Sequence, residues 1–224
     1  MPDDRPRDRD AEDEVTRIAH VLPPSTVRAW RALAPVVPRH AYLAGDTAIA
    51  VHLGHRISRD LDFFTEQRFD PEALATEIDG VGNFAASMID RGTLNGVFEE
   101  TKVQFLDASS QRLIEEPSVF GGVRVAHLPD LLATKLKVIQ DRGALRDYFD
   151  IMVIEQATDL TVEEGLSLLV EKYRPRAPEG VIASVVRGLG YLDDVEGDPS
   201  LPQPRGEIEA YWRRRQPEVL KTIR

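Results

Sequence analysis

The stretch from Tyr42 to Phe64, YLAGDTAIAVHLGHRISRDLDFF, constrains the fold of this chain more than any other segment. A short apolar segment, His40–Leu43, runs into Gly45, and the run Asp46–Leu53 carries alanines and aliphatic residues at helical spacing. A second apolar segment follows over Asp60–Phe64. The pattern predicts a strand, a glycine turn, a helix and a second strand in close succession.

The glycine turn is suited to binding a polyphosphate. Glycine adopts positive φ and lets the backbone approach a ligand closely, so Gly45 is well placed for a tight turn. The N-terminus of the helix that follows offers unpaired N–H groups and the positive end of a dipole. Together these features favour a triphosphate at this turn.

Two aspartates open the second strand. Side chains alternate along a strand, so Asp60 and Asp62 share one side while Leu61 and Phe63 face the core. Adjacent carboxylates repel each other unless cations lie between them, and ligand sets made only of oxygen suit Mg²⁺ or Mn²⁺. We therefore predict a metal site at Asp60 and Asp62. The alternative is that Asp60 caps the strand and Asp62 faces water.

The order of glycine turn, helix and Asp-x-Asp strand resembles the DNA polymerase β-type nucleotidyltransferase superfamily. The resemblance is closest to its AbiEii/AbiGii-type members, and the matching residues are Gly45, Thr47, Ala48, Gly54, His55, Arg56, Ser58 and Asp60–Phe64. It implies a metal-dependent enzyme in which Gly45, Thr47, Arg56 and Ser58 bind nucleotide. Asp46 departs from the family, which has glycine or serine there, and a carboxylate at this turn would repel a triphosphate unless it turns away or takes metal.

A second block, LPDLLATKLKVIQDRGALRDYFD over residues 128–150, resembles the later motif of the same family. The matching residues are Lys135, Arg142, Gly143, Arg146, Asp147 and Asp150. The resemblance implies that Lys135 and Arg146 contact the triphosphate and that Asp150 assists the chemistry as a base or near the metals, whereas Asp147 pairs with a neighbouring cation. One continuous helix would put Lys135, Arg146 and Asp150 on one face, although Gly143 favours a break. The alternative is an exposed, salt-bridged helix face.

The superfamily often has a third carboxylate on a neighbouring strand, and in this chain Gln104 occupies that position. In the segment Lys102–Leu106, Val103 and Phe105 alternate as core residues, which turns Gln104 to the other side. An amide is a weak metal ligand. We therefore expect metal to be held by the two carboxylates Asp60 and Asp62 together with the triphosphate and Asp150.

The remaining pattern places strands before helices, which predicts an α+β fold with a small mixed sheet followed by a helical C-terminal half. Further strands are expected over 83–90, 96–100, 102–106 and 123–126, and helices over 25–34 with Ser25 as N-cap, 71–78, 131–140, 145–156, 162–173, 181–189 and 206–223. We expect a disordered charged tail over 1–14, a nucleotidyltransferase core over 15–127 and a helical region over 128–224 that completes the active site.

Composition narrows the classes of function. The chain has no cysteine, which excludes thiol catalysis and cysteine-ligated zinc, and its net charge of −10 argues against a broad basic surface for nucleic acid. The sequence has no apolar run long enough for a membrane span and no secretory signal at its N-terminus, so we expect no membrane partner and a cytoplasmic location.

Together these features predict an enzyme that transfers a nucleoside monophosphate from an NTP to an acceptor. Its catalytic residues would be Asp60, Asp62, Lys135 and Asp150, and its cofactor would be Mg²⁺ or Mn²⁺. The family resemblance names RNA as one candidate acceptor, and an antitoxin protein as a candidate partner. Two alternatives stay open. The acidic chain favours a small-molecule acceptor such as an aminoglycoside or a metabolite, and Asp46 with Gln104 motivates a non-catalytic nucleotide-binding protein.

Overall fold

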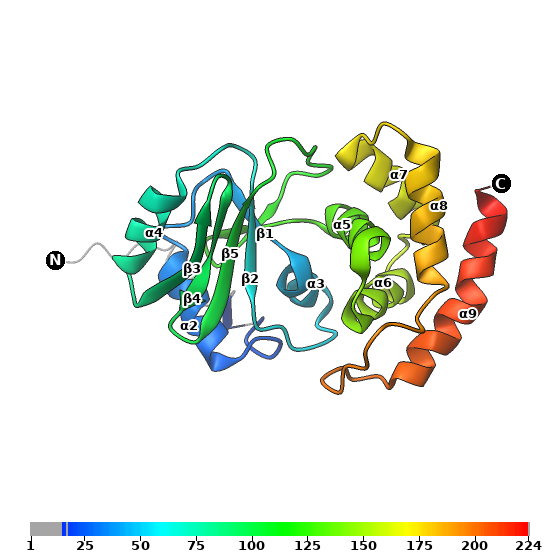
Figure 1. Ribbon diagram of the computed structural model, residues 1–224. Helices are drawn as coiled ribbons and strands as arrows, with labels where there is room; N and C mark the ends of the chain where they lie inside the picture. The colour runs from blue at the N-terminus through cyan, green and yellow to red at the C-terminus, as the bar shows by residue number, and fades with distance from the viewer. Residues whose placement is uncertain (1–14, 17, 224) are drawn as a thin grey trace. The chain divides into compact units, whose positions relative to one another are not determined.

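The computed structural model describes residues 15–16 and 18–223, and the segment 1–14, for which we predict disorder, lies outside the described residues. The described chain forms two compact units (Figure 1). The first contains the residues up to Gln111 and then Glu116–His127, and the second contains Arg112–Glu115 and the residues from Leu128 onward. Each unit is described below by itself.

A mixed sheet of seven strands, counted over the described residues, forms the centre of the first unit. Its strands are β1 (Ala41–Ala44), β2 (Leu61–Thr65), β3 (Phe84–Asp90), β4 (Thr93–Phe98), β5 (Thr101–Asp107), β6 (Ser118–Phe120) and β7 (Val123–Val125). Their order across the sheet is β3-β4-β5-β2-β1-β7-β6. Strand β2 pairs antiparallel with β1 and parallel with β5, so the predicted mixed sheet is confirmed.

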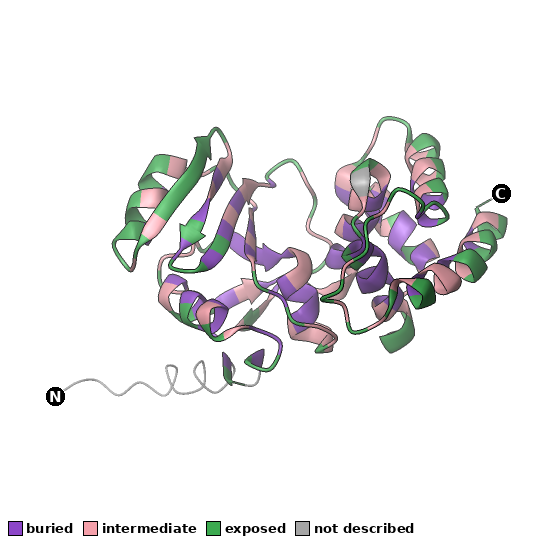
Figure 2. Cartoon of the chain, turned by 60° about the horizontal axis from the view of Figure 1, so that its bottom comes forward, coloured by how far each residue is buried: buried purple, intermediate pink, exposed green. Residues whose placement is uncertain are grey.

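Three helices of the first unit, α2 (Pro24–Leu33), α3 (Gly45–Leu53) and α4 (Pro71–Asp79), alternate with the strands. Strands β2 and β5 alternate buried and partly exposed side chains, and the stacked rings of Phe63 and Phe105, with centroids 4.7 Å apart, lie in the core between them. By contrast, the edge strand β3 is exposed along almost its whole length (Figure 2). The buried strands therefore hold β2 in a fixed position at the middle of the sheet.

Several predicted boundaries are corrected by the structure. Helix α2 begins at Pro24, with Pro23 at the N-cap and no side-chain cap, instead of at Ser25, because a proline suits the first turn, where its missing N–H is not needed. The strand predicted over 96–100 is β4, which ends at Phe98, because Glu99 takes a left-handed φ of 52° to form the turn into β5. Strand β6 was not predicted, since three residues are too few to show a period.

The second unit is helical, as predicted. It consists of α5 (Leu128–Arg142), α6 (Leu145–Ala157), α7 (Val162–Tyr173), α8 (Pro178–Leu189) and α9 (Arg205–Thr222). The continuous helix considered for residues 128–150 is wrong, because the chain leaves the helix after Arg142 and starts again at Leu145. A Cβ at Gly143 would lie 2.6 Å from the Ile139 side chain and 2.9 Å from the Tyr148 ring, so a larger residue at the break would require these side chains to shift.

The core of the second unit includes an indole and a buried ion pair. Trp212 is fully buried and donates from Nε1 to the Tyr148 carbonyl oxygen at 3.2 Å. Lys172 and Asp130 form an ion pair of 2.8 Å, each side chain only 1% exposed, and Asp130 also accepts from the backbone N–H groups of Ile114 and Glu115. These bonds attach the short segment Arg112–Glu115 to the helices. None of the helices in the described part of the chain combines the length and the apolar character that crossing a membrane requires.

Candidate active site

The glycine turn is built as the sequence predicts. Gly45 follows β1 directly, begins α3 and has a φ of +65°, a conformation that side chains rarely adopt. A Cβ at this position would lie 2.8 Å from Oδ2 of Asp62. The N-terminal turn of α3 and the Asp62 carboxylate are therefore immediate neighbours, and only glycine allows this approach.

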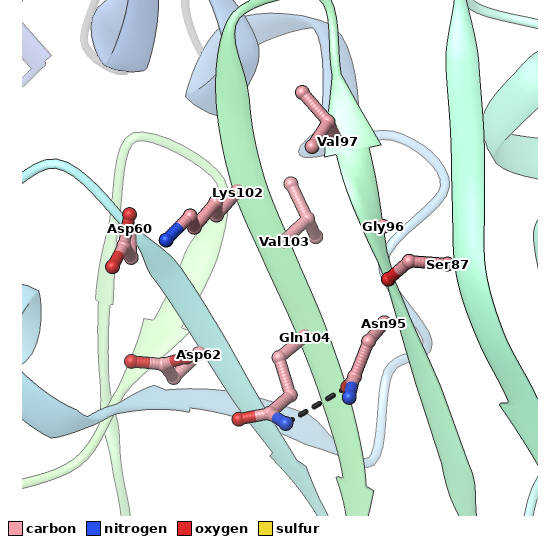
Figure 3. Close-up of a pocket in the computed structure, with 9 residues that line it drawn as sticks. All are labelled: Asp60, Asp62, Ser87, Asn95, Gly96, Val97, Lys102, Val103 and Gln104. Carbon is pink, nitrogen blue, oxygen red and sulfur yellow. Dashed lines mark hydrogen bonds between the residues drawn. The ribbon is translucent and has the colours of Figure 1, made fainter.

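Asp60 and Asp62 line one cavity of about 290 Å³ in the first unit (Figure 3). Asp60 lies one residue before β2 instead of within it, and Asp62 is the partly exposed second residue of the strand. The two carboxylates thus share one side, as the alternation predicts. The other lining residues come from β3, β4 and β5 and are Ser87, Asn95, Gly96, Val97, Lys102, Val103 and Gln104.

A row of paired residues crosses the sheet at Asp62. Ala44 is its partner on β1 and Gln104 is its partner on β5, and Gln104 is in turn paired with Asn95 on β4. Gln104 donates from Nε2 to Oδ1 of Asn95 at 2.8 Å, and its amide oxygen points away from Asn95 toward the β2 side (Figure 3). Gln104 therefore presents a neutral oxygen beside the two carboxylates.

Thr47 and Ser58 form a buried hydrogen-bonded pair behind Asp60. The Thr47 hydroxyl lies 2.6 Å from the Ser58 hydroxyl and donates to the Asp60 backbone carbonyl at 2.5 Å. Both side chains are buried and lie outside the cavity lining. Their contacts attach the segment that carries Asp60 to α3, so in this structure they fix the position of a carboxylate.

Asp46 and Arg56 form an ion pair. Their side chains meet at 2.9 Å, and the Arg56 side chain is only 7% exposed while that of Asp46 is 23% exposed. Asp46 also lies in the first turn of α3, where the helix dipole favours a carboxylate. The charge that departs from the family pattern is therefore compensated by the arginine predicted to bind phosphate.

The second block forms a buried charge cluster within the helical unit. Lys135 of α5 lies 2.6 Å from Asp147 and 2.8 Å from Asp150, both on α6, and the exposed fractions of the three side chains are 5%, 9% and 0%. The cation expected for Asp147 is thus confirmed, and the exposed salt-bridged face is wrong for these three residues. The break at Gly143 lets α6 turn back toward α5, while Arg146 on the same helix is exposed.

Each cluster belongs to one unit: Gly45, Asp60 and Asp62 to the first, and Lys135 and Asp150 to the second. The convergence of the two on one site remains a prediction. Sequence reasoning missed Lys102, Asn95 and Ser87 as residues of the cavity. The alternation of β5 could have identified Lys102, because it lies two residues before Gln104 and therefore on the same face.

A glycine turn at a helix N-terminus beside two aspartates on the next strand, in a mixed sheet with a helical second half, defines the fold of nucleotidyltransferases. A sequence profile of the family described as "Nucleotidyl transferase AbiEii toxin, Type IV TA system" matches residues 29–222. The chain belongs to this family, and its class of enzyme is nucleotidyltransferase.

Relatives and solved structures agree with this assignment. The chain is 28% identical over 175 residues to an uncharacterised protein of Aquifex aeolicus strain VF5, which covers 76% of this chain and 80% of that protein. The fold of this chain is similar to that of a protein from H. pylori proposed to be a nucleotidyltransferase. The TM-score is 0.54, the identity is 18%, and the match covers 98% of this chain and 97% of the other. The fold is also similar to that of MenT4, a nucleotidyltransferase toxin of Mycobacterium tuberculosis H37Rv, with a TM-score of 0.51, 17% identity and coverage of 98% and 95%.

Proposed function

We propose that this protein is a metal-dependent enzyme that transfers a nucleoside monophosphate from an NTP to an acceptor hydroxyl. One observation carries the proposal: Asp60 and Asp62 line a single cavity, and Asp62 touches the Gly45 turn at the N-terminus of α3. A metal-binding pair next to a phosphate-binding turn is what phosphoryl-type transfer requires, because this chemistry depends mainly on positioning and charge stabilisation.

The residues present fit a hard divalent cation. Asp60 and Asp62 supply carboxylate oxygens, and Gln104 supplies the neutral amide oxygen that its hydrogen bond to Asn95 orients. Mg²⁺ and Mn²⁺ prefer such oxygen ligands. When bound, the metal would polarise the phosphates and stabilise the charge that develops during transfer. Asp60 and Asp62 would hold it, with Gln104 as a weaker third ligand.

Positive charge is also needed on the sides of the triphosphate that metal does not cover. The N–H groups of α3 behind Gly45 and the guanidinium of Arg56 supply it in the first unit, with Thr47 and Ser58 acting through the position of Asp60. In the second unit Lys135 and Arg146 supply it, and Asp150 accepts the proton of the acceptor hydroxyl. Asp147 holds Lys135 in place through the 2.6 Å ion pair.

Family membership supports a role as the toxin of a toxin–antitoxin pair, with an antitoxin protein as partner and RNA as an acceptor. A small-molecule acceptor is the second candidate, favoured by the net charge of −10, which opposes association with RNA at long range. The compensation of Asp46 by Arg56 supports catalytic competence over the third candidate, a nucleotide-binding protein without activity.

The test is incubation of the full chain with each labelled NTP, Mg²⁺ and bulk RNA, followed by measurement of labelled product and released pyrophosphate. Asp62→Asn should abolish both signals without unfolding the protein. Asp159→Asn is the matched control, because Asp159 is exposed between α6 and α7 and should leave turnover unchanged. Mg²⁺-dependent NTP binding by the wild type without pyrophosphate release would instead identify the non-catalytic alternative.

A further inference from the structure

We infer that the side of the cavity formed by β3, β4 and β5 is the acceptor subsite, and that Lys102 binds an anionic group, such as a phosphate, next to the acceptor hydroxyl. The inference rests on the proposed function, since an acceptor exists only if the protein transfers a nucleotide. Its subject is the binding of the second substrate, for which the family motifs of this chain assign a base, Asp150, but no binding residue.

The pairing of the sheet separates two sides of Asp62. On one side lies β1, where Ala44 pairs with Asp62 and Gly45 opens α3. On the other side lies β5, where Gln104 pairs with Asp62 and the cavity extends over β4 to β3. Since the triphosphate belongs at the helix N-terminus on the first side, the second side is where an acceptor can approach the same carboxylates.

Lys102 gives this side its charge. The chain has five lysines, and carboxylates pair with three of them: Lys135, Lys137 and Lys172. Lys102 is exposed, lines the cavity and forms no ion pair with any residue that the structure describes; its ammonium group extends toward the Asp60 side (Figure 3). Once a metal satisfies the carboxylates, this amine remains for an anion of the substrate.

The rest of this wall combines three neutral hydrogen-bonding side chains, those of Ser87, Asn95 and Gln104, with Gly96, Val97 and Val103. Ser87 is at an irregularity of β3, where the register with β4 shifts between Ala86 and Met88, and such bulges redirect a side chain. The amide groups of Asn95 and Gln104 are fixed by their mutual hydrogen bond of 2.8 Å. A wall with a hydroxyl, two oriented amides and one cation matches a polar, singly or doubly charged ligand better than an apolar one.

The chemistry of the transfer step defines what the acceptor does in this subsite. The acceptor oxygen forms a bond to the α-phosphorus of the NTP, the bond from that phosphorus to the α–β bridging oxygen breaks, and pyrophosphate leaves. The hydroxyl proton passes to Asp150, the base of the proposed function. Lys102 takes no part in these bond changes. It is a positioning residue that fixes the acceptor through its anionic group.

The experiment compares acceptor use with donor binding in the full chain. The acceptor probes are a dinucleoside monophosphate with a free 3′ hydroxyl, the same compound with an uncharged methylphosphonate linkage, and a sugar phosphate. The dinucleotide and the sugar phosphate distinguish a nucleic-acid end from a phosphorylated small molecule as the source of the anion. The variants are Lys102→Ala, Lys102→Arg and, as the matched control, Lys221→Ala, an exposed lysine of α9.

Lys102→Ala should raise the KM for the charged acceptor by about tenfold or more, because a hydrogen bond to a charged group is lost. It should leave the affinity for Mg²⁺ with a non-hydrolysable NTP within about twofold of the wild type. Lys102→Arg should recover most of the loss, and Lys221→Ala should show none. The preference of the wild type for the phosphate over the methylphosphonate linkage should disappear in Lys102→Ala.

Equal effects of Lys102→Ala on NTP affinity and acceptor KM, or no effect on either, would overturn the inference. Failure of the proposed function gives a different result, namely no Mg²⁺-dependent NTP binding or no transfer by the wild type. In that case equilibrium binding of the dinucleotide alone decides: loss of binding in Lys102→Ala supports an anion subsite, and binding that is absent or independent of Lys102 overturns it.

Discussion

Gly45 lies against the carboxylate of Asp62 so closely that a Cβ on Gly45 would stand 2.8 Å from Oδ2. This contact joins the phosphate-binding turn to the metal-binding strand, and its distance is shorter than side-chain packing tolerates. Two requirements therefore meet in one residue: the positive φ of +65° and the absence of a side chain.

Gly45→Ala should abolish metal-dependent NTP turnover and lower the free energy of unfolding by about 1–2 kcal/mol, because alanine is strained at positive φ and its methyl group displaces Asp62. Turnover and chemical denaturation measure the two effects. Gly206→Ala in α9 is the control, since a Cβ there meets nothing within 4 Å. Near-normal turnover in Gly45→Ala would show that the contact with Asp62 is not needed.

The ion pair between Asp46 and Arg56 should tune the affinity for nucleotide. Arg56→Ala removes the cation that lies 2.9 Å from Asp46 beside the phosphate turn, so NTP binding should weaken. Asp46→Ser removes the partner 2.9 Å from Arg56 and should strengthen NTP binding. In a double-mutant cycle measured by NTP titration, we expect a coupling energy of about 0.5–3 kcal/mol. Strictly additive effects would mean that the pair plays no part in binding.

Lys135 and Lys172 should differ in function but not in their effect on stability. Each is a buried lysine paired with carboxylate, so Lys135→Ala and Lys172→Ala should each lower the free energy of unfolding by about 3–5 kcal/mol. At a temperature where both variants are folded, only Lys135→Ala should impair NTP binding. Asp150→Ala should spare NTP binding and reduce turnover. Equal NTP affinity in the two lysine variants would assign Lys135 a purely structural role.

The stability of the first unit should fall on acidification. Burial lowers the pKa of His52 below its ordinary value of 6.5, the hydrogen bond between its Nε2 and the Ala126 carbonyl opposes this shift, and nearby His127 adds to it. Because His52 takes up a proton more readily in the unfolded chain than in the folded one, protonation favours unfolding. The contribution of neutral His52 to the free energy of unfolding is therefore complete above about pH 6.5 and decreases as the pH falls below that value. Denaturation midpoints of wild type and His52→Gln across pH 5–8 test this, and an unchanged slope in the variant would contradict it.

The sequence predicts the elements around Gly45 well, because local chemistry determines them. A glycine with positive φ and a two-residue alternation are readable without tertiary structure, and both Asp60 and Asp62 line one cavity as their spacing requires. The same alternation turns Gln104 to the cavity. The helix break at Gly143 could be anticipated as well, although the lack of room for a side chain there, beside Ile139 and Tyr148, shows only in the structure.

Other features depend on pairing that a single sequence does not show. The cavity exists because β5 lies parallel beside β2 although β3 and β4 intervene in the chain, and this order brings Lys102 to the aspartates. Ser87 faces the cavity through a register shift, which breaks the period that would identify it. Likewise the ion pair of Arg56 with Asp46 follows from the path of the loop after α3, and no spacing rule indicates it.

The attachment of Arg112–Glu115 to the helical unit has a consequence for dissecting the protein. The chain passes from one unit to the other after Gln111, returns after Glu115 and crosses again after His127. No single cut therefore yields both units intact: a fragment that starts at Leu128 loses the backbone N–H groups of Ile114 and Glu115 that Asp130 accepts. Such a fragment should be poorly soluble on expression, whereas a circular permutant that keeps residues 112–115 beside Asp130 should fold.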